Sequence, residues 1–264
     1  SRTPRARGRK GASRVNPAEA VFFDVGWTLS HPQNSLWDCF AEVIQEEGIE
    51  TSSREVEGTA HAMIASRREQ ALREFLDGAE YPDSDEAFEA IFLAMGHVMF
   101  KMCGLEGDHE ARTRDVLERF WLLENWAVYP DVFDSIERLR ERRIRIGILS
   151  NATSHLVGFL EEIGLLGLFD FTIISAIVGT KKPDRRIFER ALQEAGVEPA
   201  NAAHVGDMYL EDILGARNAG VRPFLIDRGR HSLFPSHPEA ADHSPEEVEI
   251  VRGLDPMLDA LGVE

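Results

Sequence analysis

Apolar residues recur with two different periods along this chain, and the change of period divides it in two. Residues 31–127 show only the helical spacing of three and four, which predicts an all-helical module of about four helices. Two of these helices carry apolar stripes at Leu36, Phe40, Val43 and Ile44 and at Phe88, Ile91, Phe92 and Met95. From Pro130 onward the pattern changes to short, often β-branched apolar runs, each followed by an amphipathic segment.

The second part alternates predicted strands with predicted helices. Strands are expected over 144–149, 172–174, 202–205 and 223–226, and helices over 154–163, 184–195 and 209–219, with Gly164, Gly196 and Gly220 where the helices should end. Strand, helix, strand in series is typical of a parallel, doubly wound sheet. The apolar run 20–23 joins this sheet across a gap of about a hundred residues. The fold class is therefore α/β: a Rossmann-like doubly wound core with an inserted all-helical domain.

These patterns predict three regions. They are a basic tail over 1–17, expected to be disordered, a core formed by 18–30 and 128–264, and the helical insertion over 31–127. The first 14 residues hold six basic side chains and no acid, which suits a solvated tail or a weak anion-binding arm. Residues 231–247, rich in His, Pro, Ser and Glu, are expected to form a surface loop.

Charge and cysteine content exclude several classes of partner. The whole chain carries a net charge of −17, and without its basic head the remainder carries −23, which argues against nucleic acid as a partner. No run of 18 apolar residues occurs, so we expect a soluble protein with no membrane partner. Cys39 and Cys103 match no metal or redox spacing, which favours reduced thiols in a cytoplasmic protein.

Polar residues follow four of the predicted strands at the point where each strand ends. In an open parallel sheet this edge binds ligands, so we expect these side chains to meet there. They are Asp24 with Thr28, Ser150 with Asn151, Lys182 with Pro183, and Gly206-Asp207 with Glu211-Asp212. Each group alone has an ordinary structural interpretation as a helix cap, a turn or a favourable charge at a helix start. A nucleophile, a cation and a carboxylate pair at one edge together favour a catalytic site.

In this order, the four groups resemble the four sequence motifs of the haloacid dehalogenase (HAD) superfamily, and the insertion lies where that superfamily places a type 1 helical cap. The resemblance implies a Mg²⁺-dependent phosphatase or phosphotransferase that acts on a small phosphorylated metabolite, as a monomer or homodimer. Its chemistry would be attack of a carboxylate on phosphorus, giving an aspartyl phosphate, with cations to offset the charge of two meeting anions.

Carried over position by position, the resemblance gives each residue an expected role. Asp24 would be the nucleophile and a metal ligand, and Asp207 the second carboxylate ligand of Mg²⁺. Ser150, Asn151 and Lys182 would bind the phosphoryl group. Thr28 would brace the Asp24 loop and take part in phosphate binding, Gly26 would offer its main-chain oxygen to the metal, and Asp212 would lie in the outer shell of the metal or lysine.

Gly26 departs from the phosphatases of this superfamily, which carry an aspartate two residues after the nucleophile. That aspartate protonates the leaving oxygen and then activates water, and glycine does neither; such help is typically worth about 10² to 10⁴ in rate. We therefore expect Mg²⁺ and phosphate to bind but phosphoryl transfer to be slow. Fast transfer would need a good leaving group, or a proton from the substrate or the cap. His31 and His97 are the conceivable donors.

The missing aspartate leaves other interpretations open. Dehalogenases of the superfamily also lack it, so a 2-haloacid dehalogenase-like hydrolase is one alternative, although a pair like Asp207 and Asp212 is unusual there. Phosphonatases use a cap lysine, for which Lys101 is the single candidate in the insertion. A third alternative is a binding or regulatory protein that has kept the fold with weak or no catalysis. Substrate choice would lie with the cap, where Arg67, Arg68 and Arg73 are candidate anion contacts.

Overall fold

A computed structural model describes residues 18–60, 84–229 and 248–263. The predicted basic tail, the predicted loop over 231–247 and the candidate contacts Arg67, Arg68 and Arg73 lie outside the described residues. Within the described ranges, no helix combines the length and the apolar character that crossing a membrane would need.

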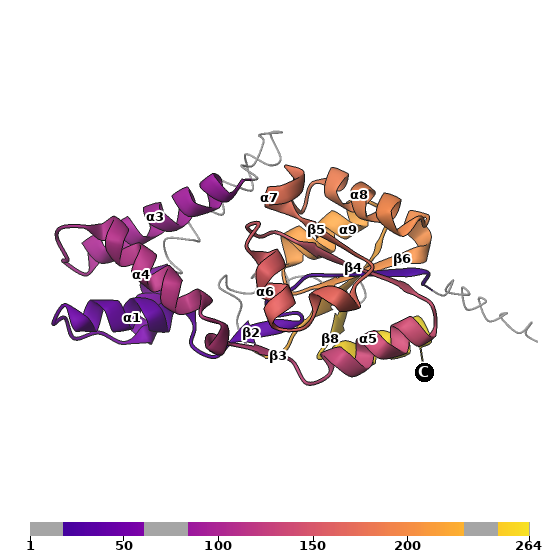
Figure 1. The fold of residues 1–264 in the computed structure, drawn as a ribbon, viewed down its shortest axis with the longest axis horizontal. Helices are drawn as coiled ribbons and strands as arrows, with labels where there is room; N and C mark the ends of the chain where they lie inside the picture. Colours follow the sequence, from indigo (N-terminus) through magenta and orange to yellow (C-terminus); the bar gives the residue numbers. More distant parts are fainter. Residues whose placement is uncertain (1–17, 61–83, 230–247, 264) are drawn as a thin grey trace, which may run out of the picture.

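A six-stranded parallel sheet forms the centre of the core, in the order β5-β4-β1-β6-β7-β8 (Figure 1). Every neighbouring pair in this sheet is parallel, which confirms the doubly wound α/β class. The strands are β1 (Ala20–Phe23), β4 (Arg145–Ser150), β5 (Phe171–Ile174), β6 (Ala202–Gly206), β7 (Arg222–Ile226) and β8 (Glu249–Val251). The sequence pattern missed β8, because three residues are too few to establish a period.

Helices cover both faces of the sheet because its strands are apolar on both sides. Val21 and Phe23 of β1 face the cluster that includes α5 (Val132–Glu141), α6 (Leu156–Glu162) and α11 (Leu254–Leu261), while Ala20 and Phe22 face α8 (Arg185–Ala195) and α9 (Gly215–Asn218). Successive side chains of a strand point to opposite faces, so one four-residue run anchors both layers. The short helices α7 (Ser175–Val178), η2 (Leu166–Leu168) and η3 (Pro199–Asn201) complete the connections.

The predicted helix over 209–219 is two segments of different type. Tyr209–Leu214 forms a π-helix (η4), and α9 continues from Gly215. Single π turns are frequent at functional sites, and this one carries Asp212. Gly196 ends α8 with φ +70°, a left-handed conformation that glycine adopts without steric cost, as predicted.

The inserted residues form a separate helical cluster beside the core (Figure 1). It contains α1 (Leu36–Glu46), a helical segment over 53–60, α3 (Asp85–Met102) and α4 (His109–Trp121), packed around Phe40, Met99, Phe100 and Phe120. Both helices predicted from these stripes are confirmed, and the stripe on α1 is buried, whereas Ile91 of α3 is 45% exposed.

The prediction of purely helical structure over 31–127 was wrong at both ends of the insertion. There the chain forms an antiparallel ribbon of β2 (Ser30–Pro32) and β3 (Trp126–Val128), preceded by the short helix η1 (Leu123–Asn125). These strands have three residues each and are stabilised by pairing with each other across the insertion, which local periodicity does not reveal. The ribbon brings the two connections between the core and the helical cluster together.

Candidate active site

The central strands of the sheet place the predicted polar residues at one edge. Asp24 directly follows β1, and Ser150 ends the neighbouring β4. Asp207 directly follows β6, the neighbour of β1 on its other side, and Asp212 lies one turn later in η4. Lys182 comes from the segment between α7 and α8, so a helix intervenes between β5 and this residue.

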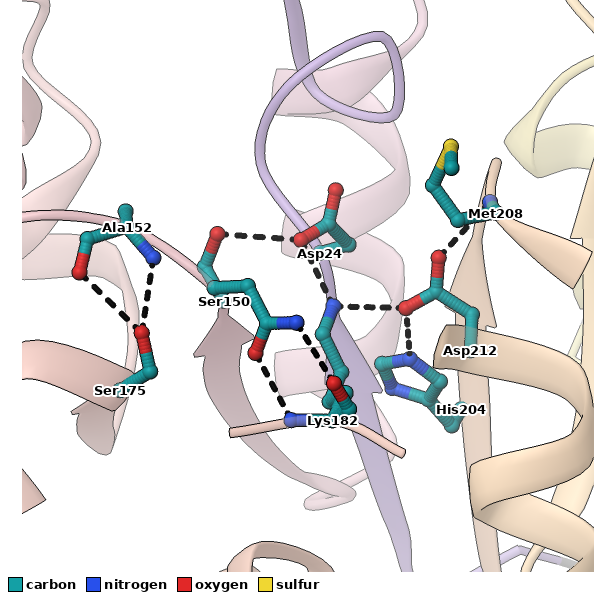
Figure 2. Close-up of polar contacts among 9 residues, drawn as sticks. Asp24, Ser150, Ala152, Ser175, Lys182, His204, Met208 and Asp212 are labelled. Carbon is teal, nitrogen blue, oxygen red and sulfur yellow. Dashed lines mark hydrogen bonds and ion pairs between the residues drawn. The ribbon is translucent and has the colours of Figure 1, made fainter. Parts of the chain in front are cut away.

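A buried lysine joins two aspartates at this edge. Its Nζ donates hydrogen bonds to Asp24 Oδ1 at 2.8 Å and to Asp212 Oδ1 at 2.6 Å, and Ser150 Oγ donates to the same Asp24 oxygen at 3.0 Å (Figure 2). Lys182 is 2% exposed and Asp212 fully buried. The structure therefore brings Asp24, Ser150, Lys182 and Asp212 into direct contact, although 158 residues separate the first aspartate from the lysine.

Asn151 positions Lys182 through the main chain. Its side-chain Nδ2 donates to the Lys182 carbonyl at 2.8 Å, and its Oδ1 accepts from the Lys182 N–H at 2.8 Å. Both polar atoms of the amide are engaged in this bracket, which links the end of β4 to the lysine segment. The expected contact between Asn151 and a phosphoryl group stays a prediction.

The loop after Asp24 is held by main-chain contacts. Val25 O accepts from the N–H groups of Leu29 at 2.8 Å and Ser30 at 3.0 Å, and Thr28 O accepts from Arg228 Nε at 2.9 Å. The Thr28 hydroxyl is buried and has no hydrogen-bond partner among the described residues. The expected brace by this hydroxyl is therefore not formed here.

Gly26 lies beside open space. A Cβ built there finds no atom within 4 Å, and the backbone is not in the left-handed region that favours glycine. Its neighbour Trp27 does have a positive φ of 53°, which is unusual for a bulky residue, and packs against Trp126 of the ribbon. Neither the backbone conformation nor the packing requires glycine at position 26, so the absence of a larger side chain there has no steric cause.

Three carboxylates gather at the edge, with one ligand oxygen each from Asp24, Asp207 and Asp212 within 4.8 Å of one another. With Lys182 as the buried cation beside them, the four groups sum to −2 when all are ionised. Hard oxygen donors and an excess charge of this size suit one divalent cation such as Mg²⁺. The donor set therefore fits the expected metal.

The charges at this edge shift one another's pKa values. Burial raises the pKa of Asp24, against the opposing effect of Lys182, and burial with the neighbouring carboxylates holds the pKa of Asp207 well above its usual range. Burial also opposes the charges of Asp212 and Lys182. Their mutual attraction outweighs it, so the pKa of Asp212 is lowered and that of Lys182 raised. Lys182 therefore stays protonated and is a poor proton donor.

His204 is a contact of the site that sequence reasoning missed. It lies inside β6, fully buried, and its Nε2 is 2.8 Å from Asp212 Oδ1 (Figure 2). Burial lowers its pKa, which favours the neutral imidazole. A histidine within the otherwise apolar run 202–206 was the available sequence signal.

The two candidate proton donors, His31 and His97, and the candidate cap lysine, Lys101, have different surroundings. The His31 ring packs against the Tyr129 ring at a tilt of 46°, with ring centroids 4.6 Å apart. His97 lies on α3 with its Nδ1 3.0 Å from that of His109, and Lys101 is exposed in the last turn of the same helix. No hydrogen bond in the part of the chain that the structure describes joins any of them to Asp24.

One contact joins the helical cluster to the β4 loop. Asp85, the first residue of α3, accepts hydrogen bonds from the Ser154 N–H at 2.7 Å and the Ser154 Oγ at 2.5 Å. Ser154 lies four residues beyond Ser150, so the start of α3 is tied to the loop that follows a phosphate-binding candidate. The hydrogen bonds to Ser154 lower the pKa of Asp85, so this carboxylate is charged at neutral pH.

Comparisons with known proteins give one consistent family. The model of haloacid dehalogenase-like hydrolases matches residues 18–220. A haloacid dehalogenase-like hydrolase domain-containing protein 3 from Danio rerio is 30% identical over 80% of this chain and 86% of its own length. A phosphoserine phosphatase from Thermus thermophilus is 37% identical over 51% of this chain and 54% of its own, so this chain spans about half of that relative.

Solved structures share the fold at lower identity. A HAD-hydrolase described from Bacillus subtilis with bound magnesium has a TM-score of 0.67 at 19% identity, covering 94% of this chain and all of that one. A 2-haloacid dehalogenase from Pseudomonas syringae has a TM-score of 0.55 at 20% identity, covering 93% and 98%. The fold is therefore shared by a protein described as a HAD-hydrolase and by one described as a 2-haloacid dehalogenase. At these identities the similarity concerns the fold alone.

Proposed function

Because this chain belongs to the haloacid dehalogenase-like hydrolase family, we propose that it is a Mg²⁺-dependent phosphatase that forms an aspartyl phosphate on Asp24. The observation that carries this proposal is the Asp24 carboxylate, held at one oxygen by Ser150 and Lys182 and gathered with two further carboxylates. The relative described as a phosphoserine phosphatase supports the same reaction type.

Asp24 has one oxygen engaged and one available. Ser150 and Lys182 both donate to Oδ1, whereas Oδ2 accepts no hydrogen bond from the described residues and points away from the lysine (Figure 2). In the proposed reaction Oδ2 attacks phosphorus, the bond from phosphorus to the leaving oxygen breaks, and water then cleaves the acyl phosphate. Lys182 and Ser150 lie where they can donate to the oxygens of the transferring group.

Mg²⁺ would be held by Asp24, Asp207 and the main-chain oxygen of Gly26. When bound, the ion supplies positive charge that offsets the meeting of two anions. Asp212 suits an outer position, because its Oδ1 already accepts from Lys182 and His204 and its Oδ2 from the Met208 N–H at 2.8 Å.

The leaving oxygen finds no evident proton donor on the described residues. Gly26 offers no side chain, and Lys182 holds its proton too firmly to release it. We therefore propose substrates whose leaving group is stable without a proton, such as acyl or aryl phosphates, or small metabolites that supply their own proton.

We further propose that the helical insertion over 31–127 acts as a cap over the Asp24 edge. The β2–β3 ribbon gathers its two connections, and the contact between Asp85 and Ser154 ties α3 to a loop of the site. A cap of this kind would exclude water and choose the substrate.

The test measures phosphate release from acetyl phosphate, 4-nitrophenyl phosphate and an alkyl phosphate, with Mg²⁺ and with a chelator. We expect release that needs the metal and is lost in Asp24→Asn, a substitution that keeps the shape of the side chain. Asp134→Asn, on the exposed face of α5, is the matched control and should keep full activity. Release that survives chelation or Asp24→Asn contradicts the proposal.

A parallel assay measures halide release from 2-haloacids, since a dehalogenase would also lack the aspartate at position 26. Halide release without metal, together with no phosphate release, would replace the phosphatase with a dehalogenase. If neither phosphate nor halide is released while Mg²⁺ still binds, a binding or regulatory protein is favoured.

A further inference from the structure

A histidine in the middle of a central sheet strand is costly for the fold. His204 lies in β6, between β1 and β7, and is fully buried. It shares a face with Ala202 and points toward α8, where the Phe188 ring meets it edge-on at 5.3 Å. Its Nδ1 is buried without a hydrogen-bond partner in the described parts of the chain. A purely apolar side chain would leave no such orphaned atom.

The other ring nitrogen makes a hydrogen bond that accounts for this histidine. Nε2 lies 2.8 Å from Asp212 Oδ1, and it donates there whether the ring is neutral or charged, because the carboxylate is an acceptor. The same oxygen accepts from Lys182 Nζ at 2.6 Å. His204 and Lys182 therefore hold one carboxylate oxygen from two directions.

Asp212 is restrained on its remaining sides as well. Its Oδ2 accepts from the Met208 N–H at 2.8 Å. Its carboxyl group also lies against Gly206, where a Cβ would come within 2.1 Å of it. Three donors and one packing contact therefore restrain this carboxylate, whose Oδ1 also accepts from Lys182 Nζ.

We propose that His204 is a positioning residue that acts through Asp212 to hold Lys182 at Asp24. Removing its N–H leaves Asp212 with two donors, so the carboxylate can turn and take the lysine with it. His204 is not a proton carrier in this scheme, because it contacts neither Asp24 nor solvent. The inference rests on the proposed phosphatase function for its kinetic test, although a binding measurement reaches it independently.

The experiment compares His204→Leu, which lacks the donor, with His204→Gln, whose side-chain amide can replace it. We expect His204→Leu to lower kcat by about 10- to 100-fold, the usual range for partners that orient a site residue, with a smaller change in KM. His204→Gln should recover most of that rate. Leu192→Ala, a core truncation on the same α8 layer, is the matched control, and should lower Tm while keeping kcat per folded molecule.

Kinetics decide the proposal if the wild type is active, and phosphate binding decides it if the wild type is not. A kcat in His204→Leu equal to that of wild type overturns the positioning role, and so does a loss in His204→Gln as large as that in His204→Leu. In either case, phosphate release that depends on Asp24 leaves the proposed phosphatase function standing. If the wild type releases no phosphate, the proposed function fails and calorimetry with inorganic phosphate and Mg²⁺ takes over. Weaker phosphate binding in His204→Leu than in wild type and His204→Gln then supports the positioning role, and equal binding overturns it.

Discussion

Replacing Gly26 with aspartate tests whether the missing acid limits this enzyme. The position is open, since a Cβ meets nothing within 4 Å and the backbone there suits any residue. The new carboxylate would join a group of residues, Asp24, Asp207, Asp212 and Lys182, whose charges sum to −2 when all four are ionised. Neighbouring negative charge raises the pKa of an added acid, which helps it to carry a proton near neutral pH.

The expected gain depends on the leaving group. A general acid contributes about 10² to 10⁴ in rate where the leaving oxygen needs a proton, which is roughly 3–5 kcal/mol of transition-state stabilisation. For an alkyl phosphate we expect Gly26→Asp to raise kcat/KM within that range. For acetyl phosphate or 4-nitrophenyl phosphate the leaving group is stable as an anion, so the gain should be small.

The assay is steady-state phosphate release with Mg²⁺ over this series of leaving groups. Gly26→Asn is the matched control, because it fills the same space without a proton to give and should leave the alkyl phosphate rate near that of wild type. Thermal melts of both variants check that the fold is retained. An equal effect on all substrates, or an equal gain in Gly26→Asn, would refute the missing-acid argument.

Two further substitutions test the contacts around the site. Lys182→Met, measured by urea unfolding with chelator at pH 7, should cost about 3–5 kcal/mol, because it leaves Asp24 and Asp212 buried without their cation. The fold lowers the pKa of Asp212 from 3.8, so the stabilisation that its charge provides is present above pH 3.8 and is lost as the pH falls below that value. The difference in unfolding free energy between wild type and Lys182→Met should therefore shrink in acid, and a constant difference would contradict this. Asp85→Ala should speed amide hydrogen exchange at Ser154 without changing exchange in the sheet, and unchanged exchange at Ser154 would count against the tie between α3 and the β4 loop.

The core fold was predictable from the sequence because its signals are local. Runs such as 144–149 and 202–205 are mostly apolar on both faces, and the helices between them carry strong periodicity, so both indicated a parallel sheet. The sequence pattern did not predict the elements that are short or that form only by pairing with a distant segment. β8, the β2–β3 ribbon and the π turn of η4 each depend on partners distant in sequence or on a local distortion that no period marks.

Sequence alone determined which chemical groups this protein holds at the edge of its sheet: Asp24, Ser150, Lys182 and the Asp207–Asp212 pair, with glycine at position 26. Only the tertiary structure decided how they are connected. It put Lys182 between two carboxylates, turned Asn151 toward the lysine main chain and left the Thr28 hydroxyl without a partner. The physical reason is distance along the chain, because hydrogen bonds between residues 30 to 158 positions apart form only after the strands pair.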